Sequence, residues 1–131
     1  MKKSGILQGA LARVIATSEH GDLLLIGDAG MPIPDGVECI DLALCEGHVP
    51  FKAALCSVLG EMTVQKAYLA TETASESPAM QQVIDAAIGD LPVERLSHED
   101  LKALSTLCKA AVRTGEYTPY ANIILESGVN F

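Results

Sequence analysis

The sequence contains few basic residues: lysine and arginine number 9, against 17 aspartates and glutamates, and the formal net charge is −8. Nucleic-acid binding depends on cationic contacts to phosphate, so this composition argues against it. The sequence also lacks any apolar run near the ~20 residues that a bilayer crossing needs. Near its start, Gln8 and Arg13 interrupt the unbroken apolar stretch that a secretory signal requires. We therefore expect a cytoplasmic protein that binds neither nucleic acid nor membrane.

Several sequence motifs for cofactors and catalysis are missing. The sequence has no G-x-G-x-x-G and no G-x-x-x-x-G-K-[ST], the motifs of dinucleotide and P-loop nucleotide binding. It also has no H-E-x-x-H zinc motif and no G-x-S-x-G nucleophile motif. A metal site built from His20, Asp22, Asp28 and His98 is conceivable, but no spacing supports it. We expect no cofactor and no metal.

The four cysteines show no C-x-x-C spacing, and each has apolar neighbours in the sequence: Cys39, Cys45, Cys56 and Cys108. This pattern favours free, buried thiols in a reducing compartment. A zinc site or a disulfide framework is the alternative.

A length of 131 residues, 49% of them hydrophobic, suits one domain over residues 1–131 with a packed core. Apolar periodicity and capping residues predict helices over Leu7–Ser18, Pro50–Leu59, Ser77–Ile88 and Ser97–Arg113. Short apolar runs predict strands over Leu23–Ile26, Cys39–Leu44, Gln65–Ala70, Pro92–Leu96 and Asn122–Leu125. Two segments read as loops, Met31–Gly36 and the polar Thr71–Ser77. This alternation predicts a three-layer α/β/α sandwich with a mixed, largely parallel sheet.

Two polar segments are candidates for a functional site. Asp28 directly follows the predicted strand Leu23–Ile26, and ligands of open α/β sheets gather where strands end. An aspartate that only bonds its own turn is the alternative. His20 precedes the same strand, and histidine is the side chain best suited to gain and lose protons near neutral pH. A histidine that merely contacts the last carbonyls of a helix would serve no such role.

Further candidates lie in the second half of the chain. His98 and Lys102 are four residues apart, so they share one face of the predicted helix, which could also be an ordinary solvated face. Tyr120 and Asn122 flank Ala121 and project to the same side of an extended chain. A phenol and an amide are suitable groups for binding hydroxyls, so the candidates together suit a sugar ligand.

The sequence resembles the D-ribose pyranases, a family related to the L-fucose mutarotases. The similarity runs through the whole chain, and the segments that carry it are 19–22, 28–34, 40–44, 60–62, 97–99, 120–125 and 128–131. The fucose enzymes typically have Asp-Ala-His-Phe-Pro where this chain has Asp28-Ala29-Gly30-Met31-Pro32, and Tyr-Gly-Asn where it has Tyr120-Ala121-Asn122. Both differences make the chain more similar to the D-ribose pyranases than to the L-fucose mutarotases. Glu19 departs from the family pattern, which often has glycine there.

The resemblance implies an isomerase that interconverts the pyranose and furanose forms of D-ribose without a cofactor. It implies His20 as the proton donor and, as sugar-binding residues, Asp28, His98, Lys102, Tyr120, Ala121 and Asn122. It also implies a homo-oligomeric ring of eight or ten subunits whose pockets are shared between neighbours. The alternatives are a mutarotase of another sugar such as L-fucose, a non-catalytic sugar-binding protein associated with ribose transport, and a scaffold with an interaction role.

Overall fold

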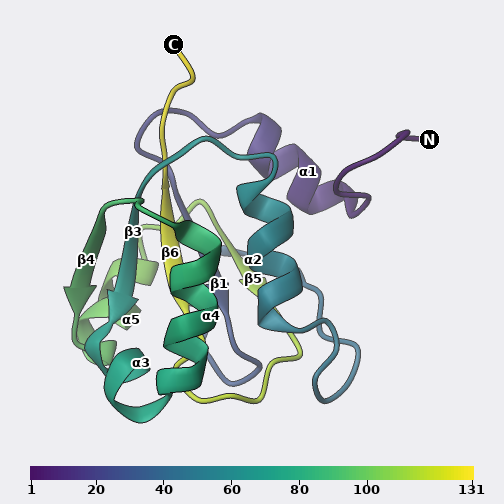
Figure 1. Ribbon diagram of the computed structural model, residues 1–131. Helices are drawn as coiled ribbons and strands as arrows, with labels where there is room; N and C mark the ends of the chain where they lie inside the picture. Colours follow the sequence, from purple (N-terminus) through teal and green to yellow (C-terminus); the bar gives the residue numbers. More distant parts are fainter.

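The computed structural model describes all 131 residues, and its centre is one six-stranded sheet (Figure 1). The strand order is β2-β5-β1-β6-β3-β4. The strands span Leu23–Gly27 (β1), Glu38–Asp41 (β2), Val64–Ala70 (β3), Val93–Leu96 (β4), Ala110–Arg113 (β5) and Ile123–Ser127 (β6). The central position of β1 explains its composition, because a strand covered on both faces is apolar along its whole length.

Strand β6 is the only strand that runs against the others. It pairs antiparallel with both β1 and β3, whereas β1 with β5, β2 with β5, and β3 with β4 are parallel pairs. The predicted mixed, largely parallel sheet is therefore confirmed. As a consequence, the start of β6 lies beside the end of β1, and the end of β6 lies beside the start of β1.

Helices cover both faces of the sheet. The helices span Gly9–Ala16 (α1), Phe51–Leu59 (α2), Thr71–Glu76 (α3), Pro78–Ile88 (α4) and His98–Ser105 (α5). The larger core contains residues of α1, α2 and α4 packed on one sheet face, and a smaller core places Leu101 of α5 against the other (Figure 1). Alternate residues of β1 divide between them: Leu24 and Ile26 face the larger core and Leu25 the smaller one. The three-layer prediction is confirmed. None of the five helices has the length and apolar character of a membrane-spanning segment.

The predicted helix over Ser97–Arg113 is wrong in its second half. The helix begins as expected, because Ser97 Oγ accepts a hydrogen bond from the Asp100 backbone N–H at 3.1 Å. It ends at Ser105, and Ala110–Arg113 form strand β5 between β2 and β1. A short apolar run fits a buried strand as well as a helix, and the tertiary position of this segment decides in favour of the strand.

Two smaller expectations also need correction. The segment Thr71–Ser77, expected to be a loop, contains helix α3. All four cysteines are free, as predicted, but only Cys108 is buried; Cys39, Cys45 and Cys56 are exposed. Apolar neighbours in the sequence do not bury a side chain that points outward from a helix or an edge strand.

Candidate active site

Asp28 and Asn122 meet where β1 ends and β6 begins. Ile26 pairs with Ile123 across the two strands, so the antiparallel register places Asp28 beside Asn122. The Asp28 backbone N–H donates to Asn122 Oδ1, and Asn122 Nδ2 donates to Asp28 Oδ2, both at 3.0 Å. The second carboxylate oxygen, Oδ1, accepts from the Gly30 backbone N–H at 2.9 Å. Each oxygen therefore keeps further acceptor capacity for a ligand hydroxyl.

Burial shapes the chemistry of this pair. Asn122 is fully buried, and desolvation raises the pKa of the Asp28 carboxyl above its ordinary value of 3.8, against the lowering effect of the Asn122 hydrogen bond. Gly27 makes room for the arrangement, because a Cβ at this position would lie 2.9 Å from Asn122 Oδ1. Glycine at position 27 therefore leaves the space through which the Asn122 side chain reaches Asp28.

Tyr120 and His98 adjoin this pair. Their rings meet edge to face, with centroids 5.1 Å apart. The first helical residue of α5 is His98, whose backbone N–H donates to Glu72 Oε2 at 2.9 Å. Its Nδ1 atom is buried without a hydrogen-bond partner, which is unusual for a buried polar group. We call the set Asp28, His98, Tyr120, Ala121 and Asn122 the Asp28 cluster.

The backbone around Tyr120 is also unusual. Tyr120 has a φ of 61°, a conformation that is uncommon for residues other than glycine and that often occurs at functional sites. Thr73 Oγ1 of α3 holds it by donating to the Tyr120 carbonyl at 2.8 Å. Ala121 is fully buried in the larger core. The Lys102 side chain forms an ion pair with Glu99 at 2.7 Å, one helical turn after His98 on α5.

A cavity of about 370 Å³ opens beside the cluster. It is lined by Asp28–Gly30, Arg113 and Glu116–Pro119. Arg113 is fixed there, since its guanidinium donates to both carboxylate oxygens of Asp41 and to the Ala29 carbonyl. The volume is in the range of small-molecule sites, and Asp28, Arg113 and Glu116 bring charged groups to the lining, which suits a hydroxyl-rich ligand.

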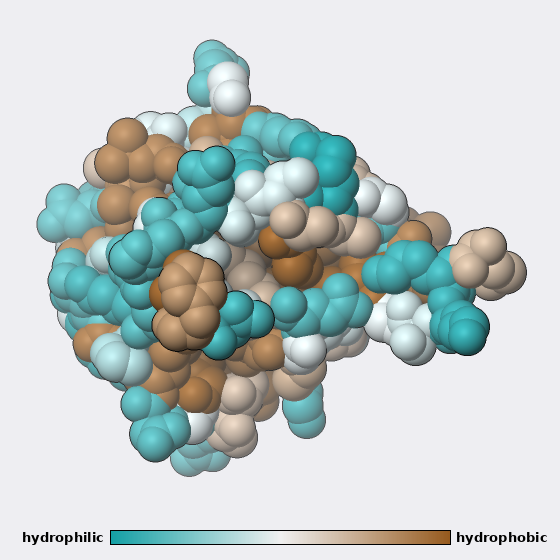
Figure 2. All heavy atoms as spheres, turned by 90° about the horizontal axis from the view of Figure 1, so that it is seen from above, coloured by the Kyte–Doolittle hydropathy of each residue, from teal (hydrophilic) through white to brown (hydrophobic).

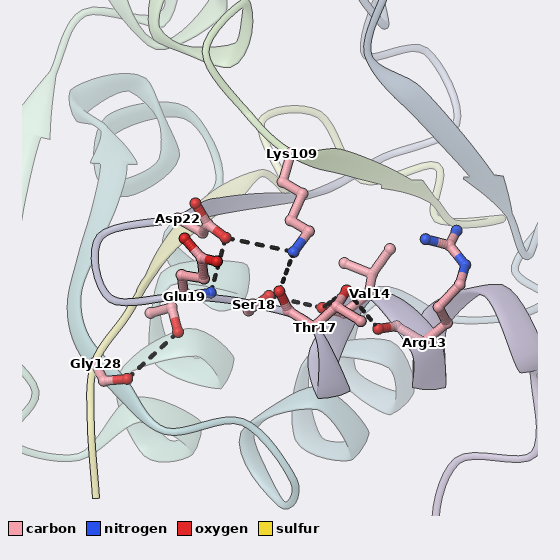
Figure 3. A network of polar contacts seen from close by, with 9 residues as sticks. Arg13, Val14, Thr17, Ser18, Glu19, Asp22, Lys109 and Gly128 are labelled. Carbon is pink, nitrogen blue, oxygen red and sulfur yellow. Dashed lines mark hydrogen bonds and ion pairs between the residues drawn. The ribbon is translucent and has the colours of Figure 1, made fainter.

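His20 precedes the opposite end of β1, in the turn between Glu19 and Asp22. Figure 3 shows the polar contacts of Glu19 and Asp22 with each other and with Lys109. Within the turn, the Glu19 backbone N–H donates to Asp22 Oδ2 at 2.8 Å, and Lys109 approaches the same oxygen at 3.4 Å. Across to β6, the Gly21 backbone N–H donates to the Ser127 carbonyl at 2.9 Å. Gly21 has a φ of 88°, which glycine adopts without strain. The turn thus holds His20 on a fixed backbone.

The His20 side chain is exposed and begins a row of polar contacts along the sheet. His20 Nε2 lies 2.9 Å from Gln65 Oε1, and Gln65 Nε2 donates to Glu126 Oε2 at 2.6 Å. The Tyr68 hydroxyl donates to the other oxygen, Glu126 Oε1, at 2.9 Å. We call these four residues the His20 network.

Within one chain, the residues of the predicted site therefore lie in two separate groups, at opposite ends of β1. Five residues of β1 separate His20 from Asp28, about 17 Å at the rise of a strand. The metal set that includes both residues is not assembled in the chain, and no three His, Cys, Asp or Glu side chains are grouped to hold a metal ion. Sequence reasoning missed the residues that hold the site in place: Gln65, Glu72, Thr73 and Glu126. None belongs to a recognisable motif, and their roles follow from strand pairing.

Comparison with known proteins identifies the family. Residues 1–130 match the RbsD / FucU transport protein family. The chain belongs to this family. Relatives described as D-ribose pyranase include proteins of Chloroflexus aggregans, 48% identical, and Symbiobacterium thermophilum, 49% identical, each over the full length of both chains.

Solved structures of RbsD / FucU proteins are also similar to the chain. The structure of Bacillus subtilis RbsD complexed with D-ribose is 42% identical, with a TM-score of 0.96 and full coverage of both chains. The fucose mutarotase of Streptococcus pneumoniae, in complex with L-fucose, is 26% identical, with a TM-score of 0.79 over 99% of this chain and all of that one. The fold is thus shared across the family, and the ribose protein superposes better.

Proposed function

We propose that this protein is a D-ribose pyranase, an isomerase that interconverts the pyranose and furanose forms of D-ribose. The observation that carries the proposal is the full-length match to a structure complexed with D-ribose, at a TM-score of 0.96. Relatives near half identity with the same described activity agree with it. Its place is the cytoplasm, where it supplies ribofuranose for phosphorylation and catabolism.

The Asp28 cluster binds the sugar in this proposal. The free lone pairs of the Asp28 carboxylate and the Tyr120 hydroxyl bind sugar hydroxyls, while Asn122 keeps Asp28 in place. Ala121 is fully buried and serves to position its neighbours Tyr120 and Asn122. The unpartnered Nδ1 of His98 gains a partner when sugar binds, and His98 is our candidate for the base. Lys102 is a less direct contact, because it must first leave Glu99.

His20 supplies the acid. It protonates the ring oxygen while a base removes the proton of the anomeric hydroxyl, the bond between C1 and the ring oxygen breaks, and the aldehyde forms. Another hydroxyl then attacks the carbonyl and the proton transfers reverse. Ring opening already occurs in water, so the ~10²–10⁴-fold contribution of positioned acid–base groups suffices. No step requires oxidation or reduction.

A shared pocket follows from the separation of His20 and Asp28. Both ends of the sheet expose large apolar side chains: Leu44 and Tyr117 beside the Asp28 cavity, and Val129 and Phe131 beyond the His20 network. Figure 2 views the His20 end and shows hydrophobic residues between hydrophilic ones. A head-to-tail contact between the two ends of neighbouring copies would cover these side chains and complete the site. Head-to-tail contacts form a ring when the rotation between neighbouring copies closes, and we propose such a ring of eight or ten subunits.

The second candidate is mutarotation of another sugar, since an L-fucose complex has the same fold. A sugar-binding protein without catalysis is the third. Saturation-transfer NMR on D-ribose, D-allose and L-fucose distinguishes them. We expect fast exchange between the pyranose and furanose signals of ribose, and its loss in His20→Ala with the fold retained. Exchange of fucose alone contradicts the ribose proposal, and ribose binding without exchange in the wild type supports the non-catalytic alternative.

A further inference from the structure

The orientation of the Gln65 amide is fixed by Glu126. An ionised carboxylate can only accept hydrogen bonds, so Gln65 must present its NH₂ group to Glu126 Oε2, at 2.6 Å. The reversed amide would place two acceptor oxygens against each other. Gln65 Oε1 consequently faces His20 Nε2, at 2.9 Å.

Glu126 stays an acceptor at neutral pH. Hydrogen bonds from Gln65 and then Tyr68 hold the pKa of the Glu126 carboxyl below its ordinary value of 4.5. Burial and the neighbouring carboxylate raise the pKa of the Tyr68 phenol above 10.0, so its hydroxyl keeps the proton that it donates to Glu126 Oε1. Both oxygens of Glu126 are thereby engaged by donors, and the row of contacts has a single direction.

This direction determines which nitrogen of His20 carries hydrogen. Gln65 Oε1 has no proton to give, so His20 Nε2 must donate. We propose that Gln65 is a positioning residue that holds His20 in the Nε2–H form, so that Nδ1 is the atom that exchanges a proton with the sugar. The inference rests on the proposed function, because it assigns the reacting atom of the proposed acid.

The proton balance of the step is simple. The Nδ1–H bond of the imidazolium breaks and a new O–H bond forms at the ring oxygen, while the electron pair of the bond from C1 remains on that oxygen. A base of the Asp28 cluster receives the proton of the anomeric hydroxyl. His20 is left neutral with Nε2–H still bonded to Gln65 Oε1, ready for the reverse transfer. Nδ1 is suited to this role, because His20 is exposed and its only hydrogen bond within the chain uses Nε2.

The direct test is ¹⁵N NMR of histidine-labelled protein at a pH where His20 is neutral. The chain has three histidines, so His20→Ala identifies the signal. We expect the Nε2–H form in the wild type. Gln65→Lys places a donor where the acceptor was, with Glu126 available as its ion partner, and should convert His20 to the Nδ1–H form. The matched control is Gln82→Lys, on the exposed side of α4, which should leave the spectrum unchanged.

Exchange kinetics separate a positioning role from a structural one. Gln65→Lys should lower kcat for ribose exchange at least tenfold with little change in KM and unchanged thermal unfolding, as expected when a positioned hydrogen bond is lost. Gln65→Glu combined with Glu126→Gln exchanges acceptor and donor, keeps an acceptor beside His20 and should restore kcat to within about threefold of the wild type.

Two outcomes overturn the tautomer assignment: an Nδ1–H form in the wild type, or an unchanged tautomer in Gln65→Lys. Neither affects the proposed function, which fails instead if His20→Ala retains full ribose exchange. A normal exchange rate in Gln65→Lys with an inverted tautomer also overturns the assignment of Nδ1 as the reacting atom.

Discussion

His20 and Asp28 lie at opposite ends of strand β1, with the whole strand between them. His20 precedes the strand, in a turn held by Asp22, and Asp28 follows the strand, in a turn held by Asn122. A single copy of the chain cannot bring both to one sugar molecule. The proposed chemistry therefore requires at least two copies, and this requirement leads to the first prediction.

Mixed oligomers should recover activity that neither variant has alone. His20→Ala removes the proposed acid, and Asn122→Ala disrupts the Asp28 cluster, so each homogeneous oligomer should lose ribose exchange. Refolding the two together produces contacts between an intact His20 and an intact Asp28 cluster. At equal amounts a quarter of the contacts are of this kind, and NMR exchange rates should approach that fraction of wild type. No recovery in co-refolded oligomers would contradict a shared pocket, as would a monomeric mass of the wild type in light scattering.

Gly27→Ala should weaken the sugar site while preserving the fold. The new Cβ would approach Asn122 Oδ1 at 2.9 Å and Met31 Cβ at 3.0 Å, so the amide must move from Asp28. We expect a rise in KM for ribose of about tenfold, the effect of one lost hydrogen bond to a charged group. The matched control is Gly9→Ala, because nothing lies within 4 Å of that Cβ and alanine favours helix α1. An unaltered KM in Gly27→Ala would show that Asn122 does not position Asp28 for the sugar.

Asn122→Ala should also reduce stability. The substitution removes the fully buried Asn122 amide and leaves the backbone N–H and one carboxylate oxygen of the half-buried Asp28 without their partners. A buried group left unpaired costs about 1–3 kcal/mol, and urea unfolding at fixed protein concentration measures the change. A loss below 0.5 kcal/mol would indicate that water replaces the amide.

The pH dependence of stability should report on Glu126. Its carboxyl has a lowered pKa in the folded protein, so its contribution to stability is present above 4.5 and disappears as the pH falls through the folded value. Gln65→Leu removes a donor to this carboxylate and should raise its pKa. The variant should therefore be less stable than the wild type at pH 7, with a smaller difference at pH 3. NMR titration of the Glu126 carboxyl checks the shift, and an identical titration in both proteins would disprove the contact.

The thiol of Cys108 should resist modification. Burial raises its pKa to about 12, so almost no thiolate forms in the native protein at pH 8. Cys56 on α2 is exposed and serves as the internal reference. Alkylation followed by mass spectrometry should label Cys56 quickly and Cys108 only in urea. Equal labelling rates in native protein would mean that the segment after α5 opens readily.

The sequence predicts the layers of this fold because apolar periodicity and helix caps depend only on residues that are close together in the chain. Ser97 illustrates this: a serine before a polar first turn predicts where α5 begins, and its side chain forms the expected cap. The position where α5 ends, by contrast, depends on tertiary contacts and not on neighbouring residues. Ala110–Arg113 could extend a helix, and only the space between β1 and β2 makes them a strand.

The same contrast between local sequence signals and tertiary contacts applies to the candidate site. Asp28 was predictable because it follows a buried strand, and Asn122 because it begins another. Their contact depends on β6 running antiparallel to β1, which no residue of either strand indicates. The partners of His20 were not predictable for the same reason, since Gln65 and Glu126 meet only through the pairing of β3 with β6.

Strand β6 connects the Asp28 cluster at one end of the sheet to the His20 network at the other. Asn122 precedes its first residue at the Asp28 cluster, and Glu126 and Ser127 are its last two residues, at the His20 end. The length of the strand therefore sets the distance between the Asp28 cluster and the His20 network of one copy, which belong to two different pockets in the proposed assembly. An insertion or deletion of even one residue within it would reverse the facing of every side chain beyond that point and misplace one end of the site. Length variation among functional members of the family should consequently fall in the loops and spare this strand.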